Sequence, residues 1–354
     1  MPRTLLRGRD WITTQEWSRA ELETALTLAA DLKVKFASGE PHELLRGKTN
    51  YLIFYNPSLR TRNSFETGMT QLGGHANFLS PASMYSPGTS DEAAAGELVK
   101  ESKEAVSDTA RVLSRYGHAI SIRMFQDATG WVHGRGNAML REFARWADIP
   151  IINMEDDLYH PCQAMADLLT LKERLGTLEG KKIAITWAYS DKDRTIGVMH
   201  SAALLCSRFG MDVTVAHPKG YEFDDHVTDW CHENAKLSGG AYSVTDSMDE
   251  AFRDADAVMP KSWIGNSFLP PQNASIDLEA ARALNLRHRD WKCTDEKLAL
   301  CNENVLYMHC APVDRGNEVT DEIVDGSHSV VFDQAENRLH VQKAIMCLVI
   351  GGRP

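Results

Sequence analysis

Short apolar runs alternate with segments of helical periodicity along this chain, and this alternation most constrains the fold. Seven runs are predicted to be buried strands, at 51–55, 119–122, 149–152, 182–187, 211–216, 257–259 and 305–309. Apolar residues at helical spacing lie between them. Strands separated by helices imply parallel βαβ units with right-handed crossovers. The sequence therefore predicts an α/β protein with two tandem parallel-sheet domains.

The length of 354 residues agrees with two domains at roughly 150 residues each. We assign 1–155 together with 335–354 to one domain, and 156–334 to the other. The first helix is predicted to start at Ser18, because Glu21 three residues later completes a capping box. Its apolar stripe runs from Leu22 to Phe36 at helical spacing.

Charge and cysteine content exclude several classes of protein. The net charge is 38 − 49 = −11, which argues against nucleic acid or an anionic membrane as a partner. No run approaches the ~20 apolar residues of a membrane span, and no apolar segment follows the N-terminal arginines as in a signal peptide. Seven scattered cysteines without a CxxC pair predict reduced thiols, a cytoplasmic location and no bound metal.

Two long segments, 80–95 and 264–283, carry no clear periodicity. The second contains the dipeptide Pro270-Pro271. Irregular segments of this length inside compact domains usually have a function. Surface insertions without a function are the alternative.

A polar turn follows the first predicted strand, which ends at Asn56-Pro57, and leads into a helix. Ser58, Arg60 and Thr61 lie in this turn. Free N–H groups and the positive dipole end of a helix start bind anions, and guanidinium groups donate paired hydrogen bonds to phosphate. The turn therefore indicates an anion site, with an ordinary solvated helix cap as the alternative.

Three further patches place polar residues at the ends of predicted elements. His160 and Gln163 lie three residues apart at a helix start where Pro161 fits the first turn, although a histidine there is often only a cap. Residues 309–312 follow an apolar strand, where ligands gather in open α/β sheets. Residues 333–343 predict an amphipathic helix, for which a purely structural role is the alternative. No Gly-rich dinucleotide turn, P-loop or GxSxG motif occurs, which disfavours common nucleotide and acyl-transfer enzymes.

Together these patches resemble the aspartate/ornithine transcarbamylase superfamily over nearly the whole chain. Its signatures occur in its order as Ser-x-Arg-Thr-Arg at 58–62, His-Pro-x-Gln at 160–163, His-Cys-x-Pro at 309–312 and Ala-Glu-Asn-Arg-Leu-His at 335–340. The segment leading to Arg123 resembles its second phosphate-binding region. The resemblance implies transfer of a carbamoyl group from carbamoyl phosphate to an amine. It also implies a carbamoyl-phosphate domain, an amino-acid domain, no cofactor, and a homotrimer with sites at subunit contacts.

The resemblance assigns carbamoyl phosphate to Ser58, Leu59, Arg60, Thr61, Arg123, His160, Gln163, Cys310, Ala311 and Arg338. Catalytic roles fall within this set to Arg60, Thr61, Arg123, His160, Gln163 and Cys310. Thr61, Arg123 and His160 would polarise the carbonyl and hold the oxyanion. Gln163 would hold the carbamoyl NH2 together with the carbonyls of Cys310 and Ala311. No covalent intermediate is implied, so Cys310 is not expected to act as a nucleophile.

The predicted acceptor-binding residues resemble one branch of the superfamily. Where ornithine enzymes carry Asp-x-x-x-Ser-Met-Gly, this chain has Lys261-Ser262-Trp263, as N-acetylornithine carbamoyltransferases and an uncharacterised related branch do. That branch has a trefoil knot formed by a Pro-rich loop, and residues 264–283 are the matching candidate. A long insertion without a knot is the alternative.

The match to N-acetylornithine enzymes is incomplete. Asp314 and Glu318 stand where those enzymes carry an arginine and a lysine, and Glu155 lies five rather than four residues before His160. We expect the acceptor to be bound by Glu155, Lys261, Ser262, Trp263, Asp314 and Glu318. Two anions in place of two cations favour an acceptor with a free α-amine or another amine-bearing compound. N-acetylornithine and ornithine transfer in arginine biosynthesis remain alternatives.

A catalytically silent member of the superfamily is the main rival function. The intact set of predicted catalytic residues argues against silence. An aspartate carbamoyltransferase chain is disfavoured by the cysteine at position 310, and a dinucleotide-binding oxidoreductase by the missing Gly-rich turn.

Overall fold

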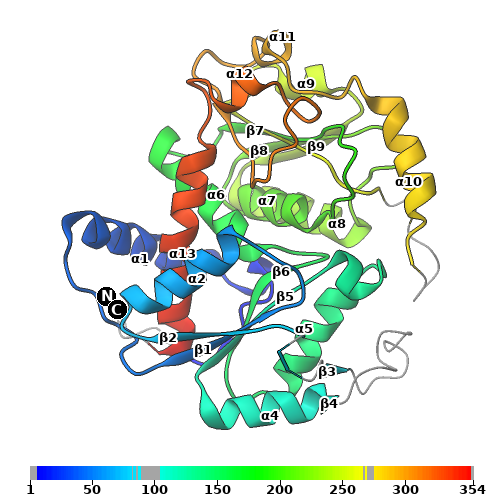
Figure 1. Cartoon of the computed structure of the whole chain (residues 1–354). Helices are drawn as coiled ribbons and strands as arrows, with labels where there is room; N and C mark the ends of the chain where they lie inside the picture. Colours follow the sequence, from blue (N-terminus) through cyan, green and yellow to red (C-terminus); the bar gives the residue numbers. More distant parts are fainter. Residues whose placement is uncertain are drawn as a thin grey trace. The chain divides into compact units, whose positions relative to one another are not determined.

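A computed structural model of the protein describes residues 6–81, 83–84, 87–88, 104–265, 268 and 275–351. The chain forms two compact units, each with the predicted parallel α/β architecture (Figure 1). Over the described residues, the first unit combines Met1–Met165, Pro271–Ser275 and Asn337–Pro354, and the second combines Ala166–Pro270 with Ile276–Glu336. The sequence predicted domain boundaries at 155–156 and 334–335. It also predicted that one domain binds carbamoyl phosphate and the other the amino acid, and these roles stay predictions.

The first unit contains a four-stranded parallel sheet in the order β2-β1-β5-β6. Its strands are β1 (Thr49–Phe54), β2 (His75–Leu79), β5 (Ala119–Met124) and β6 (Ile151–Asp156). The strand order reverses between β1 and β5, because β2 lies on one side of β1 and β5 on the other. Ligands bind beyond the carboxyl ends of strands at such a switch point.

Helices cover both faces of this first sheet. The helices are α1 (Arg19–Ser38), α2 (Arg60–Gln71), α4 (Val106–Tyr116), α5 (Arg135–Trp146) and the later part of α13 (Val331–Ile350). On one face, Tyr51 and Ile53 of β1 join a core cluster with α4 and α5. On the other, the Asn50 side chain contacts Met346 of α13. The alternation of β1 side chains between two buried faces explains its continuous apolar sequence.

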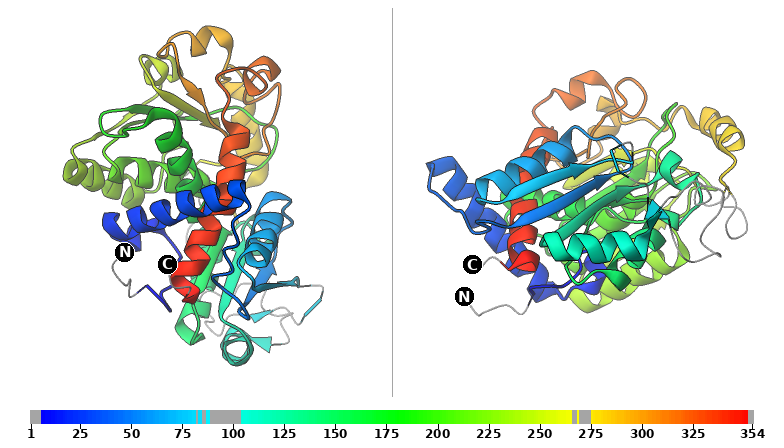
Figure 2. Two further views of the ribbon diagram at one scale, coloured as in Figure 1. Left: turned by 90° about the vertical axis from the view of Figure 1, so that its left-hand side faces the viewer. Right: turned by 60° about the horizontal axis from the view of Figure 1, so that its bottom comes forward.

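The start of α1 is as predicted, since Ser18 caps the helix and Glu21 completes the capping box. The predicted stripe is buried from Leu22 to Leu32, but Phe36 is 46% exposed. The ring of Phe36 lies 5.7 Å from that of His340 in α13. Phe36 is therefore a partly exposed contact with α13 rather than a core residue, and Figure 2 shows α1 crossing that helix.

The prediction that residues 333–343 form a helix is confirmed, and residues 333–340 have both buried and solvent-accessible positions. Beyond this stretch the helix is fully buried, because every residue from Val341 to Ile350 is buried. Lys343 is among them, and its Nζ donates to Gln71 Oε1 (2.9 Å). Burial lowers the pKa of Lys343 to about 8. This half of α13 is enclosed on all sides; Lys343 has an internal partner, whereas the side-chain amide of Gln342 is buried without a hydrogen-bond partner among the described residues.

The second unit contains a five-stranded parallel sheet in the order β11-β10-β7-β8-β9. Its strands are β7 (Lys182–Trp187), β8 (Asp212–Ala216), β9 (Ala241–Thr245), β10 (Ala257–Lys261) and β11 (Leu306–Tyr307). The order reverses between β7 and β10, and Trp187 pairs with Lys261 where both strands end. The second sheet therefore has its own switch point, beside Lys261.

Helices also lie on both faces of the second sheet (Figure 1). They are α7 (Gly197–Arg208), α8 (Asp225–Ser238), α9 (Met248–Phe252), α10 (Leu278–Asn285), α11 (Asp295–Leu298) and α12 (Asp321–Val324). Helices α7 and α8 pack together on one face, and α9 covers the other. Right-handed crossovers that proceed in opposite directions from β7 require this division.

Both segments predicted to be irregular fall partly outside the described residues. In the first, β3 (Pro87–Gly88) pairs with β4 (Glu104–Ala105). In the second, α10 begins at Leu278 with Asp277 as its cap, so the prediction of irregular structure up to 283 is wrong there. The predicted knot was assigned to 264–283, and residues 266, 267 and 269–274 of that segment lie outside the described residues. Within the described parts of the chain, no helix has the length and apolar character needed to cross a membrane.

Candidate active site

The predicted anion-binding turn lies at the switch point of the first sheet. Helix α2 begins at Arg60, and the Thr61 N–H donates to Ser58 Oγ (3.1 Å). Asn56 Oδ1 accepts from the Phe125 N–H (2.9 Å), which joins the segment after β1 to the segment after β5. The start of α2 therefore presents its N–H groups and positive dipole end beyond the carboxyl ends of two neighbouring strands.

Three guanidinium groups gather at this helix start. The buried Thr61 Oγ1 accepts from Nη2 of Arg338 (2.7 Å) and Nη1 of Arg123 (3.4 Å). Burial lowers the pKa of Arg338 to about 10, and the guanidiniums of Arg123 and Arg60 act in the same direction. The Nε atoms of Arg123 and Arg338 are buried without a hydrogen-bond partner among the described residues. Buried donors of like charge call for an anion.

Glu155 is a carboxylate that faces this cluster. It forms an ion pair with Nη1 of Arg123, and its Oε2 lies 3.5 Å from Nε2 of His160. A β-bulge creates this arrangement, because Ile122 pairs with Asn153 whereas Arg123 pairs with Glu155. Such bulges re-aim side chains beside active sites.

The turn between β6 and α6 (Pro161–Leu175) is held by Asp156. This carboxylate is fully buried, and each of its oxygens accepts two hydrogen bonds. The donors are the N–H groups of Leu158 (2.8 Å) and Tyr159 (2.6 Å) and the side-chain amides of Asn137 (2.7 Å) and Asn153 (2.9 Å). These bonds determine the path of the chain into α6.

His160 and Gln163 lie at the start of α6, as predicted. The helix begins at Pro161, and the Gln163 N–H donates to the His160 carbonyl (3.1 Å). Both side chains are buried. The structure therefore brings His160 to the Arg123–Glu155 pair through the turn that Asp156 holds.

In the second unit, His309 links two of the predicted segments. Its backbone N–H donates to Gln334 Oε1 (2.9 Å), and its Nδ1 accepts from the Ala311 N–H (2.9 Å). Because Nδ1 is an acceptor, Nε2 carries the proton and donates to Glu318 Oε2 (3.1 Å). Ala311 adopts a left-handed φ of 48° beside the buried Cys310. These bonds hold residues 309–311 beyond the end of β11.

Glu318 is surrounded by donors rather than open to a ligand. Besides His309, it accepts from the N–H groups of Ser262 (2.7 Å) and Asp314 (2.8 Å). Burial would raise the pKa of Glu318, but the His309 imidazole and Lys261 outweigh burial and lower it to about 2. Glu318 therefore fixes the segments that carry Lys261 and Asp314.

Asp314 is engaged in the same way. Its carboxylate accepts from Ser190 Oγ, Lys192 Nζ and Asn317 Nδ2. Burial opposes ionisation, but these bonds, led by that of Lys192, lower the pKa of Asp314. Lys192 remains half exposed. The predicted pair of acidic residues is thus largely neutralised inside the second unit.

The side chains of the predicted 261–263 segment have different environments. Lys261 is 7% exposed, and its Nζ donates to the Ser262 carbonyl (3.3 Å). Trp263 is wholly buried, and its indole N–H donates to the Tyr221 carbonyl (2.9 Å). Trp263 therefore supports the segment from the core, and its indole ring is not exposed to a ligand.

Two protein-family profiles match this chain, one over its first half and one over its second half. The profile described as "Aspartate/ornithine carbamoyltransferase, carbamoyl-P binding domain" matches residues 9–173. The profile described as "Aspartate/ornithine carbamoyltransferase, Asp/Orn binding domain" matches residues 179–349. The chain belongs to the aspartate/ornithine carbamoyltransferase family. The superfamily predicted from the four signatures is thereby confirmed.

N-acetylornithine carbamoyltransferases and ornithine carbamoyltransferases are both among the relatives of this carbamoyltransferase. It is 38% identical to the N-acetylornithine carbamoyltransferase of Xanthomonas campestris over 97% of this chain and 98% of that one. It is 39% identical to the ornithine carbamoyltransferase of Halalkalibacterium halodurans over 98% and 97%. Its fold matches an acetylornithine transcarbamylase complexed with acetylcitrulline, at TM-score 0.88 and 37% identity over 97% and 99%. It also matches the ornithine carbamoyltransferase of Pyrococcus furiosus, at TM-score 0.83 and 36% identity over 99% of each chain.

The predicted site residues of this carbamoyltransferase divide between the units. The first unit brings together the residues at the start of α2, Arg123, Glu155, His160, Gln163 and Arg338, whereas Cys310, Ala311 and the remaining acceptor residues belong to the second unit. Asp156, Ser190 and Lys192 were not predicted from the sequence. Their partners lie far along the chain or on the backbone, so no spacing rule could have identified them.

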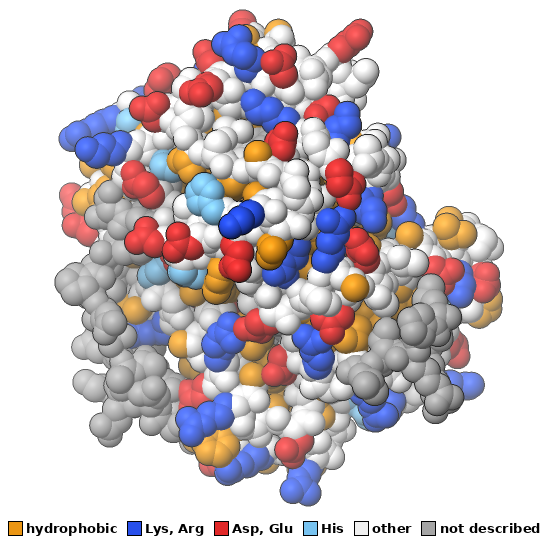
Figure 3. Space-filling view, turned by 180° about the vertical axis from the view of Figure 1, so that it is seen from behind, with side chains coloured by type: hydrophobic (Ala, Val, Ile, Leu, Met, Phe, Trp, Pro, Cys, Tyr) orange, Lys and Arg blue, Asp and Glu red, His pale blue; other side chains and the backbone are white. Residues whose placement is uncertain are grey.

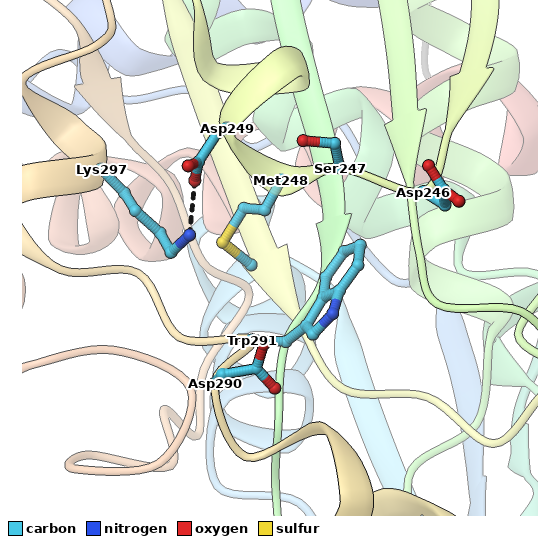
Figure 4. Close-up of a pocket in the computed structure, with 7 residues that line it drawn as sticks. All are labelled: Asp246, Ser247, Met248, Asp249, Asp290, Trp291 and Lys297. Carbon is cyan, nitrogen blue, oxygen red and sulfur yellow. Dashed lines mark hydrogen bonds and ion pairs between the residues drawn. The ribbon is translucent and has the colours of Figure 1, made fainter.

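A cavity of about 190 Å3 in the second unit lies apart from the predicted residues (Figure 4). Its lining includes Asp246, Trp291 and the ion pair of Asp249 with Lys297.

On the face shown in Figure 3, basic side chains lie among acidic ones rather than in one basic patch. Over the described residues, no group of three or more His, Cys, Asp or Glu side chains is arranged to hold a metal ion. All seven cysteines are described, and none forms a disulfide.

Proposed function

We propose that this enzyme transfers the carbamoyl group of carbamoyl phosphate to the amine of an ornithine-like amino acid and releases phosphate. The observation that carries the proposal is the group of three guanidiniums around Thr61 at the start of α2. This group combines buried cationic donors with a helix N-terminus, which suits a phosphorylated dianion. The first unit would bind carbamoyl phosphate, and the second would bind the acceptor.

Ser58, Leu59, Arg60 and Thr61 would bind the phosphate, with Arg338 at its side. Thr61, Arg123 and His160 would polarise the carbamoyl carbonyl. Gln163, with the carbonyls of Cys310 and Ala311, would hold the carbamoyl NH2. The neutral amine of the acceptor would attack the carbonyl carbon, and the oxyanion would lie among the donors. The C–O bond to phosphate would then break, and the phosphate would take the amine proton. Catalysis of this kind consists mainly of orientation and electrostatic stabilisation.

The acceptor is proposed to be ornithine or a derivative of ornithine. Relatives named for ornithine and for N-acetylornithine are equally similar to this chain, and a solved N-acetyl-L-ornithine transcarbamylase variant holds carbamyl phosphate with N-succinyl-L-norvaline. Lys261 would bind the acceptor's carboxylate. The acidic residues Asp314 and Glu318 supply no cation for an acyl group, which favours a free α-amine.

The test is phosphate release from carbamoyl phosphate with ornithine, N-acetylornithine, N-succinylornithine, putrescine or lysine. Arg60→Ala should lower kcat/KM at least about 100-fold, because a charged donor to the phosphate is lost. Arg62→Ala is the matched control, since Arg62 is exposed and pairs with Glu66 (2.8 Å). Equal loss in both variants would contradict the site. A wild-type enzyme that fails to bind carbamoyl phosphate would support the silent alternative.

The resemblance also supports a homotrimer, a cytoplasmic enzyme and a knotted second unit as proposals. Sedimentation should give about three times the chain mass of 39.5 kDa. A monomer at enzyme concentrations well above those of the assay would contradict the trimer.

A further inference from the structure

The carboxylate of Glu155 pairs with the guanidinium of Arg123, on which the proposed function depends. Nη1 of Arg123 donates to Thr61 Oγ1 and also forms the ion pair with Glu155. His160 Nε2 lies 3.5 Å from the same carboxylate oxygen. Two of the three groups assigned to the carbamoyl carbonyl are therefore engaged by a residue of the protein itself.

The charges of this group change when a dianion arrives. Arg60, Arg123 and Arg338 carry +3 and Glu155 carries −1, so the unliganded group has a net charge of +3 − 1 = +2. A bound carbamoyl phosphate brings two negative charges beside the carboxylate. Like charges at close range repel strongly in a site with little water. The unsatisfied Nε donors of Arg123 and Arg338 offer the incoming anion new partners.

The backbone places this carboxylate opposite Arg123 through an irregular pairing. With a regular register after Ile122 and Asn153, the residue opposite Arg123 would be Met154, which is wholly buried. The bulge inserts Met154 and brings Glu155 into the opposite position. A bulge interrupts the ladder of hydrogen bonds, and its presence beside the site indicates that the position of residue 155 matters.

We propose that Glu155 is a positioning residue that holds Arg123 and His160 until carbamoyl phosphate displaces it. Its released carboxylate then accepts a hydrogen bond from the attacking amine of the acceptor. The inference rests on the proposed function. The added point is that binding of carbamoyl phosphate frees the Glu155 carboxylate, which can then accept a hydrogen bond from the acceptor.

The test is isothermal titration of Glu155→Gln with carbamoyl phosphate and with inorganic phosphate, without an acceptor. Loss of the competing carboxylate should lower both Kd values about tenfold, as expected for one close charge pair. Glu23→Gln is the control, because Glu23 pairs with Arg19 (3.0 Å) within α1; its Kd values should match those of the wild type. Glu155→Ala repeats the measurement if the first variant does not fold.

Steady-state assays give the second readout. The KM for L-ornithine or N-acetyl-L-ornithine should rise at least about tenfold in the variant that binds carbamoyl phosphate more tightly. Opposite changes for the two substrates cannot arise from general loss of structure. If wild-type enzyme binds carbamoyl phosphate but the variants bind it equally or more weakly, the role of Glu155 is wrong and the proposed function stands. If wild-type enzyme does not bind carbamoyl phosphate, both fail.

Discussion

The position of a residue in a sequence motif does not by itself show that its side chain contacts a ligand, and Glu318 is an example. Glu318 stands where relatives are expected to carry a cation, and its position alone indicates contact with the acceptor. Its carboxylate instead accepts from His309, Ser262 and Asp314. A buried charge must be satisfied inside the protein, and donors from three segments do so. Glu318 is therefore first a residue that joins the segments of the second unit.

Glu318→Gln should reduce the acid dependence of stability. The pKa of Glu318 is lowered to about 2 from 4.5, so its ionised form stabilises the folded state fully above about pH 4.5. That contribution, on the order of 3 kcal/mol, declines as the pH falls from 4.5 towards 2. Urea denaturation at pH 7, 5, 4 and 3 should show a steeper fall for the wild type than for the variant. Glu303→Gln, at an exposed position, is the control. Parallel curves for wild type and Glu318→Gln would refute this account.

At the scale of elements, the buried strands were predictable, including the edge strands β6 and β11, whereas the edge strands β2 and β9 were not. β1, β5, β7 and β10 have neighbours on both sides, and their continuous apolar runs follow from burial on both faces. β2 and β9 form edges and are half exposed, so their sequences, HANFL and AYSVT, contain too few apolar residues to stand out. The prediction thus succeeded where burial determines the sequence.

Gly265→Ala should strongly destabilise the second unit. A Cβ at Gly265 would lie 1.8 Å from the carbonyl oxygen of Gly220, so two backbone segments would have to separate. The expected loss is at least about 3 kcal/mol in the free energy of unfolding. Gly68→Ala is the control, because its Cβ would meet only side-chain atoms, Cε of Met346 at 3.1 Å and Cγ of Lys343 at 3.3 Å, rather than backbone. Urea unfolding compares the two, and a loss below 1 kcal/mol at Gly265 would mean that these segments move apart easily.

For the whole molecule, an acidic protein binds a dianion through a local group of cations. The motifs identified this group because each contributes a residue type suited to phosphate. They could not show that Glu155, predicted as an acceptor residue, pairs with Arg123, or that Asp156 holds a turn, because a bulge and four internal hydrogen bonds create these arrangements. Long-range pairing of this kind leaves no periodic signal in the sequence.

Carbamoyl phosphate should raise the midpoint temperature of unfolding. A ligand at 100 times its Kd stabilises the folded state by about 2.7 kcal/mol, which amounts to a few degrees for a protein of this size. Differential scanning calorimetry of wild type, Arg60→Ala and Arg62→Ala should show the shift only in the first and third. A shift of equal size in Arg60→Ala would place the anion elsewhere on the protein.

The enclosed half of α13 affects the order in which the chain can fold during synthesis. Residues 337–350 complete the core of the first unit, yet the ribosome makes them after the whole of the second. Until they are made, the first unit lacks the helix that contacts Asn50 of β1, whereas the second unit already has all its strands. The first unit is therefore translated first but completes its core last, and chaperones would bind it while that core is incomplete.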